Sequence, residues 1–449
     1  MQASRTLSSF LAAASLTLVS TVANADDKRA PQDYGVPEEG TTVGDMAVWP
    51  PRVVLFPLWL LTEFVVRRPT GAVVQSAEKG QWIQNAQDLL TFGRRGAPLG
   101  EIAIFPSALL DFGLKPSVGF NAQWNYIVAD ENSIALHFGT WGPDWIAARI
   151  ADSYALSKTE KVFIEGTLVR RRDNPFSGVG PLSRQGARSR YSSTISQVAI
   201  GHEKRFWRSS FIRSQAGSRT LFFGDTGCCD EPSLEQEVAA GRLFAPGYGQ
   251  GYAGAFQRVD FELDSREALP APGSGLRVEL HEESVYTLDP NPGQERRAWV
   301  KYGGSVGAAL DLTKQQRVIS AAVAAELVDP LAGSVPFPDQ VTLGGDNLMP
   351  GFLRSRLVDR SSVVGSLQYR WPIWVFLDGV IHAAAGNVFG ARFAGFDVKQ
   401  TRLSSGIGVR SNGARESGFE LLFAVGSEPF NDQFKVDSVR LVLGTHHGF

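Results

Sequence analysis

The sequence predicts an all-β protein, a transmembrane antiparallel β-barrel of about sixteen strands preceded by a short N-terminal helical segment. Three observations predict this fold. Apolar and polar residues alternate in many runs of about ten residues, which is the length that a membrane-spanning strand requires. Short turns between the runs alternate with long loops. The chain also begins with a segment typical of exported proteins.

Residues 1–25 have the features of a secretory signal peptide. Arg5 precedes an apolar run over residues 10–22, and small residues occupy the positions before a predicted cleavage after Ala25. A retained membrane anchor is the weaker alternative, because the apolar run is shorter than the roughly 20 residues of a spanning helix. We therefore expect export, with the mature chain beginning at Asp26.

Residues 26–100 are expected to form a periplasmic linker followed by amphipathic helices. The first part is polar and rich in Pro and Gly. Residues 53–66 are apolar but too short to cross a bilayer as a helix, and weaker helical spacing continues over residues 77–92. The barrel itself is predicted to occupy residues 101–449.

Strict alternation places the side chains of a run on two opposite faces of a strand, as over residues 118–126 and 419–425. A soluble β-sandwich would show the same alternation, but its strands are usually about five or six residues long. Aromatic residues such as Trp141 and Trp207 lie near run ends, as in the interfacial girdle of a membrane barrel. Length and aromatic placement both favour the barrel.

The runs are even in number, as in bacterial barrels. Long connections are expected over residues 173–188, 220–247 and 329–360. The predicted strands begin near residues 102, 117, 132, 144, 161, 189, 204, 250, 274, 296, 315, 361, 374, 400, 416 and 436.

Composition and motifs exclude several classes of function. The net charge of −2 becomes −3 when Arg5 leaves with the signal peptide, so nucleic acid is not an expected partner. No nucleophile, zinc or phosphate-binding motif is present, so we expect neither an enzyme nor a cofactor. Cys228 and Cys229 are expected to be an exposed loop pair, with a vicinal disulfide or half a metal site beside Asp225 and Asp230 as alternatives.

Five motifs follow one another in the last quarter of the chain. They are Gly344-Gly345, Met349-Pro350-Gly351-Phe352, Gln368-Tyr369-Arg370, residues 382–389 (HAAAGNVF) and residues 406–410 (GIGVR). Their order resembles that of the BamA/TamA superfamily, also called the bacterial surface antigen family. That family has Gly-Gly, then V-R-G-F or L-R-G-F, then E-Y-R, F-x-D-x-G-N-V-F and G-x-G-x-R. The resemblance implies a sixteen-stranded outer-membrane barrel with a loop folded into its lumen.

Two family residues are replaced here. Pro350 stands where the family has the loop Arg, and Ala384 stands where it has the Asp that pairs with that Arg. Losing both partners can be neutral, whereas losing one leaves a buried charge at a cost of about 3–5 kcal/mol. We expect a replacement tether between Arg354 or Arg356 and Asp378.

The resemblance implies a role in inserting or translocating protein or lipid at the bacterial outer membrane. Expected partners are outer-membrane lipid, client outer-membrane or secreted proteins, and the barrel-assembly machinery for the chain's own insertion. Family insertases carry POTRA domains before the barrel. Residues 26–100 do not show the pattern of such a domain, so a POTRA-less member is expected.

A weakly paired seam between the first strand (residues 102–112) and the last (residues 438–449) is the expected mechanism. Pro106 removes one backbone donor from the first strand. The last run includes Gly444 and ends at Phe449, and it resembles the C-terminal signal of outer-membrane proteins. The alternative is a passive pore or structural barrel that keeps the fold without insertase activity.

Overall fold

The structure is a computed structural model. It describes residues 89–97, 100–111, 113–183, 188–224, 228–266, 273–288, 296–312, 316–345, 348–374, 377–411, 419–432 and 435–445, together with Phe56, Leu60, Phe64 and Arg68. The predicted signal peptide and most of the predicted linker lie outside these residues, so those predictions stay untested. Within the described residues, no helix is both long enough and apolar enough to cross a membrane.

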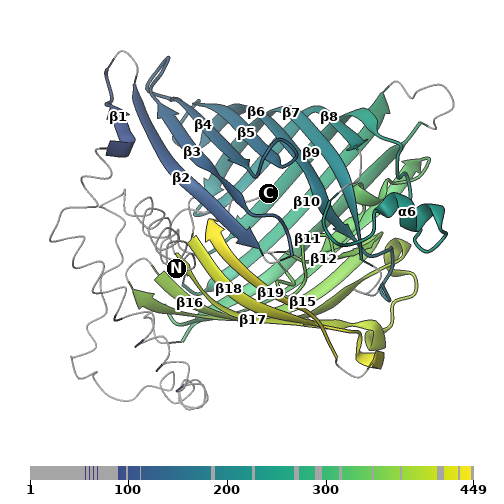
Figure 1. Cartoon of the computed structure of the whole chain (residues 1–449). Helices are drawn as coiled ribbons and strands as arrows, with labels where there is room; N and C mark the ends of the chain where they lie inside the picture. The colour runs from purple at the N-terminus through teal and green to yellow at the C-terminus, as the bar shows by residue number, and fades with distance from the viewer. Residues whose placement is uncertain are drawn as a thin grey trace, which may run out of the picture.

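Sixteen antiparallel strands close into one barrel, in which each strand pairs with the next and the last pairs with the first (Figure 1). The first eight are β2 (Glu101–Asp111), β3 (Ser117–Asn125), β4 (Asn132–Thr140), β5 (Ile146–Ala155), β6 (Glu160–Phe176), β7 (Ser189–Trp207), β8 (Ser210–Gly224) and β9 (Tyr252–Asp264). The other eight are β10 (Gly275–Leu288), β11 (Ala298–Asp311), β12 (Val318–Ala332), β15 (Ser361–Trp374), β16 (Leu377–Phe389), β17 (Arg402–Ser411), β18 (Phe419–Ser427) and β19 (Val436–Thr445). The predicted fold class is confirmed.

The two ends of the barrel differ in their connections. Short turns, such as the two residues between β7 and β8, gather at one end, which we call the turn end. The opposite end, the loop end, carries the long connections after β6, β8 and β12. The predicted strand starts agree with the structure to within a few residues, and the largest difference is at β8, which begins at Ser210 rather than near 204.

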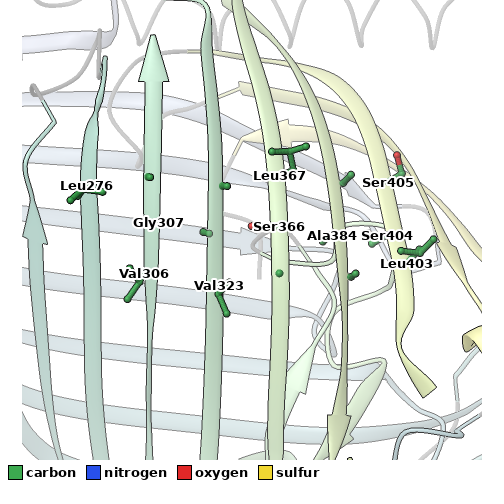
Figure 2. A pocket seen from close by; sticks show the side chains of 16 residues that line it. Leu276, Val306, Gly307, Val323, Ser366, Leu367, Ala384, Leu403, Ser404 and Ser405 are labelled. Atoms are coloured by element: carbon green, nitrogen blue, oxygen red, sulfur yellow. The ribbon is translucent and has the colours of Figure 1, made fainter. Parts of the chain in front are cut away.

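The outer face of the barrel is apolar, as a lipid-facing wall requires. Figure 2 shows part of it, a shallow depression of about 720 Å³ that crosses β10, β11, β12, β15, β16 and β17. Bulky side chains such as Leu276, Val323 and Leu367 are more than half exposed there, and small residues lie between them. Apolar side chains exposed in this pattern meet the hydrocarbon of a bilayer without cost.

The connection between β12 and β15, residues 333–360, folds into the barrel, and we call it the inward loop. It contains the 3-10 helix η4 (Phe337–Asp339) and a small hairpin of β13 (Val341–Leu343) and β14 (Leu357–Asp359). Three of its apolar side chains, Phe337, Val341 and Leu357, are at most 1% exposed. The loop and the barrel wall therefore enclose an apolar core between them.

Shorter elements decorate the loop end. The helix α6 (Leu234–Ala239) begins at a capping box in which Ser233 and Gln236 exchange side-chain and backbone hydrogen bonds. Leu234 packs with Phe176 and Phe337, so α6 and the inward loop share one apolar cluster. The 3-10 helices η5 (Ala391–Phe393), η6 (Val398–Gln400) and η8 (Phe430–Asp432) complete this end.

One short strand lies before the barrel. Residues 91–92 belong to β1 (Thr91–Gly93), so the predicted helical segment over residues 77–92 is wrong at its end. The physical reason is tertiary, because the β2 edge offers unpaired backbone groups that local helical spacing cannot anticipate. The pairs are Thr91 with Ala103, Phe92 with Ile102 and Gly93 with Glu101.

Candidate functional site

The ladder that closes the barrel is much shorter than its neighbours. Among the described residues, β19 and β2 share three residue pairs, Val442 with Asp111, Leu443 with Leu110 and Gly444 with Leu109. The next shortest ladder, β17 with β18, has seven pairs. In Figure 1 the dark-blue β2 and the yellow β19 lie next to one another where the barrel closes. The expected seam corresponds to this ladder, which contains Gly444, and the opening of the seam stays a prediction.

Two described strands pair with this edge of β2. β1 pairs with residues 101–103, and β19 pairs with residues 109–111. Between them, residues 104–108 have no strand partner on this edge within the described part of the chain. Pro106 lies in this interval and has no N–H to offer to a neighbouring strand. Phe449 and the three residues before it are outside the described residues.

A buried ion pair crosses the seam. The Arg440 guanidinium donates from Nε to Asp111 Oδ1 at 2.8 Å and from Nη2 to Asp111 Oδ2 at 2.7 Å. Both residues point into the barrel and are less than 7% exposed. A bidentate Arg–carboxylate contact is strong and directional, so this pair supplements the three-pair ladder.

The Gly-rich part of the inward loop depends on backbone that only glycine adopts without strain. Gly344 has φ +111°, and a Cβ there would lie 2.1 Å from the Leu353 carbonyl oxygen. The Gly345 N–H donates to the Phe352 carbonyl at 2.8 Å. This turn places the Phe352 side chain against Gly426 of β18, fully buried.

The Pro350-Gly351 segment is bound to the last three strands. The Gly351 N–H donates to Ser404 Oγ of β17 at 2.8 Å, and Ser438 Oγ of β19 donates to the Gly351 carbonyl at 2.5 Å. A Cβ on Gly351 would lie 2.1 Å from the Val425 carbonyl oxygen of β18. Glycine is required here because the loop backbone approaches the wall this closely.

The position of Ala384 explains how the loop is held without the family's ion pair. Ala384 lies on the lumenal face of β16 in an apolar cluster with Met349 and Phe352. Val364 and Val388 belong to the same cluster. Dispersion and burial of apolar surface therefore act where the resemblance places an Arg–Asp pair.

The predicted tether is wrong in its acidic partner. Arg356 Nη2 binds Asp437 Oδ2 of β19 at 3.1 Å, and both side chains are 2% exposed. Asp378 instead lies at the turn end of β16, where Arg370 is its partner at 3.7 Å. Arg356 meets the loop end of β19, so the length of the barrel separates it from Asp378. Arg354 lies within electrostatic range of Tyr191, also near the loop end.

Asp437 is shared by two buried arginines. Arg402 of β17 is 0% exposed and approaches the same Asp437 oxygen at 3.3 Å, with Glu428 at 3.0 Å. The carbonyl of Ser183, in the loop after β6, accepts from both Arg356 and Arg402. Burial lowers the pKa of Arg356 to about 10, so the guanidinium stays charged at neutral pH.

The other end of the inward loop is fixed to the opposite wall. Asp339 accepts from the Tyr252 hydroxyl of β9 at 3.0 Å and lies 3.7 Å from Arg219 of β8. Lys301 of β11 donates to the Gln340 carbonyl at 3.2 Å. The inward loop thus contacts both walls of the lumen. The loop after β6 contacts the inward loop as well, because the Gly180 N–H donates to the Val358 carbonyl.

Cys228 and Cys229 form a disulfide with each other, so the interpretation as an unlinked exposed pair is wrong. They line a polar cavity of about 310 Å³ beside Arg190 and Glu231. Asp225, one residue of the alternative metal site, is outside the described residues. Within the described residues, no cluster of three or more His, Cys, Asp or Glu side chains could hold a metal ion.

The sequence identified the loop motif and the seam but missed the residues that join them. Asp111, Ser404, Asp437 and Ser438 were not predicted as site residues. Asp111 and Arg440 fall at lumenal positions of the alternating pattern, which was a usable signal. The pairing of Asp437 with two arginines depends on side-chain packing that alternation does not encode.

A closed ring of amphipathic antiparallel strands with short turns at one end and long loops at the other defines a membrane β-barrel of the bacterial outer-membrane type. Residues 256–437 match the Omp85 superfamily domain. This part of the chain therefore matches an Omp85 superfamily domain, and the predicted resemblance is confirmed.

Among solved structures, the chain is similar to BamA from Haemophilus ducreyi lacking POTRA domains 1–3. The TM-score is 0.54 at 12% identity, over 77% of this chain and 70% of that chain. CdiB from Acinetobacter baumannii and CdiB from Escherichia coli give TM-scores of 0.45 and 0.44 at 10% and 11% identity. These matches cover 76% and 78% of this chain and less than two thirds of each CdiB chain, 59% and 64%. No curated protein matches the chain significantly.

Proposed function

We propose that this barrel inserts or translocates protein or lipid at the bacterial outer membrane through its β2–β19 seam, and that it is not an enzyme. One observation carries the proposal: within the described residues, the closing ladder has three pairs, and residues 104–108 of β2 have no strand partner on that edge. Unpaired backbone groups on such an edge can hydrogen-bond an incoming extended segment. Client outer-membrane or secreted proteins and the surrounding lipid are the proposed partners.

The energetics favour opening at this place. With a net contribution of about 1 kcal/mol for each backbone hydrogen bond, the three-pair ladder is the weakest of the barrel ladders in the part of the chain that the structure describes. The Arg440–Asp111 pair adds a charge-assisted contact that holds the closed state but does not extend the ladder. A passive pore has less support, because the inward loop contacts both lumen walls.

The test locks the seam with a disulfide. Leu110→Cys and Leu443→Cys face each other across the seam. Leu421→Cys with the same Leu443→Cys is a matched control, because Leu421 faces Leu443 in the well-paired β18–β19 ladder. The readout is the rate at which a urea-unfolded model barrel protein folds into vesicles containing each purified variant.

We expect oxidation to abolish the acceleration in the seam pair, reduction to restore it, and the control pair to stay active in both states. Full acceleration by the oxidised seam pair would refute the proposal. Acceleration that is absent even in the unmodified protein would also refute it and would favour a structural barrel.

A further inference from the structure

One side chain on the last strand contacts both the first strand and the inward loop. Arg440 lies on β19, binds Asp111 of β2 with two nitrogens, and places its third nitrogen, Nη1, 3.3 Å from the Pro350 carbonyl. We propose that Arg440 couples the inward loop to the seam, so that release of the loop weakens the seam and opening of the seam weakens the loop.

The neighbouring contacts support this coupling. Ser438, two residues before Arg440 and on the same lumenal face, donates to the Gly351 carbonyl at 2.5 Å. Arg440 and Ser438 therefore hold consecutive carbonyls of the loop from one strand. A displacement of β19 from β2 moves both donors, and a displacement of the loop removes an acceptor from Arg440.

Because Arg440 is buried, breaking one of its two contacts while keeping the other costs free energy. Arg440 is 3% exposed, so loss of either acceptor leaves N–H groups without their partner in a region where water competes poorly. The Pro350 carbonyl and the Asp111 carboxylate bind the same guanidinium, so each strengthens the binding of the other by the same factor. The Pro350 carbonyl thus orients Arg440 for its bidentate contact with Asp111. Arg440 acts on the seam through that contact and is therefore a positioning residue.

The inference deepens the proposed function, since it describes how the same seam would be regulated. Its test measures the seam and the loop directly and does not use insertion activity. A barrel that fails to accelerate folding of a client would refute the proposed function and leave the coupling to be decided by these two readouts.

Seam closure is read as the rate of disulfide formation between Leu110→Cys and Leu443→Cys in full-length protein in vesicles. Loop release is read as maleimide labelling of Met349→Cys, a position that is fully buried in the closed state. Arg440→Lys keeps the charge and cannot make the bidentate contact. Arg410→Lys is the matched control, because Arg410 binds Glu420 at 2.9 Å within the β17–β18 ladder.

We expect Arg440→Lys to slow seam cross-linking and speed loop labelling, each by about tenfold, while Arg410→Lys changes neither. Asp111→Asn should reproduce both effects, which guards against a folding defect particular to one variant. Phe352→Ala loosens the loop without touching the seam and should slow seam cross-linking only when Arg440 is present. Faster loop labelling in Phe352→Ala with an unchanged seam, or a seam effect that persists in Arg440→Lys, would overturn the inference.

Discussion

The substitution Asp437→Asn removes the carboxylate that Arg356 and Arg402 share while keeping its volume. The Arg356–Asp437 contact of 3.1 Å corresponds to a Coulomb attraction of about 5 kcal/mol at an effective dielectric constant of about 20. Arg402 keeps Glu428 at 3.0 Å, whereas Arg356 keeps the hydroxyl and carbonyl of Ser183 and a longer-range attraction to Glu428. We expect a loss of about 3–5 kcal/mol, the range for an orphaned buried partner.

The double variant Arg356→Met with Asp437→Asn should be clearly more stable than Asp437→Asn alone, because no orphaned charge remains at Arg356. The free energy of unfolding is measured by urea titration in vesicles, and the coupling energy is taken from the double-mutant cycle. Asp130→Asn is a control, because Asp130 and Arg95 form an exposed ion pair. Its loss should leave the free energy of unfolding unchanged. A small loss in Asp437→Asn, or losses that simply add, would refute the reasoning.

Three further predictions concern the loop and the lumen. Gly351→Ala should destabilise the barrel by about 1–3 kcal/mol in urea titration, because its Cβ would lie 2.1 Å from a β18 carbonyl; unchanged stability would contradict this. Asn387→Ala should speed proteolysis of the loop after β6, because the fully buried Asn387 amide donates to the Pro181 carbonyl at 3.0 Å; an unchanged cleavage rate would exclude this role. Planar-bilayer recordings should show no large steady conductance, since the inward loop contacts both lumen walls; a wide open pore would favour the passive-pore alternative.

The number, order and spans of the strands could be predicted because a lipid-facing wall imposes alternation along each run. Position 384 shows what such patterns leave out. The sequence revealed that the family's Asp is replaced by Ala384, but not that Met349 and Phe352 fill the space with apolar contacts. Packing of this kind depends on distant segments meeting in the lumen.

Charged partners were the least predictable part of the site. Arg356 was correctly chosen as a tether, yet its partner is Asp437 rather than Asp378, because the barrel places them at opposite ends of the strands. β1 was missed for a related reason, since its strand conformation comes from its pairing with β2 and not from its own sequence. The local alternation of apolar and polar residues shows on which face of a strand a side chain lies. The register between distant strands decides which side chains become its partners.

Hydrogen exchange of the β19 amides, measured in vesicles and resolved by fragment, tests the weak seam most directly. The account predicts that β19 exchanges much faster than β7, whose ladder with β6 has fifteen residue pairs, against three pairs at the seam among the described residues. It also predicts that Leu110→Cys with Leu443→Cys slows exchange in β19 when oxidised. Protection of β19 equal to that of β7, with no response to the disulfide, would contradict the claim that the barrel opens at β2 and β19.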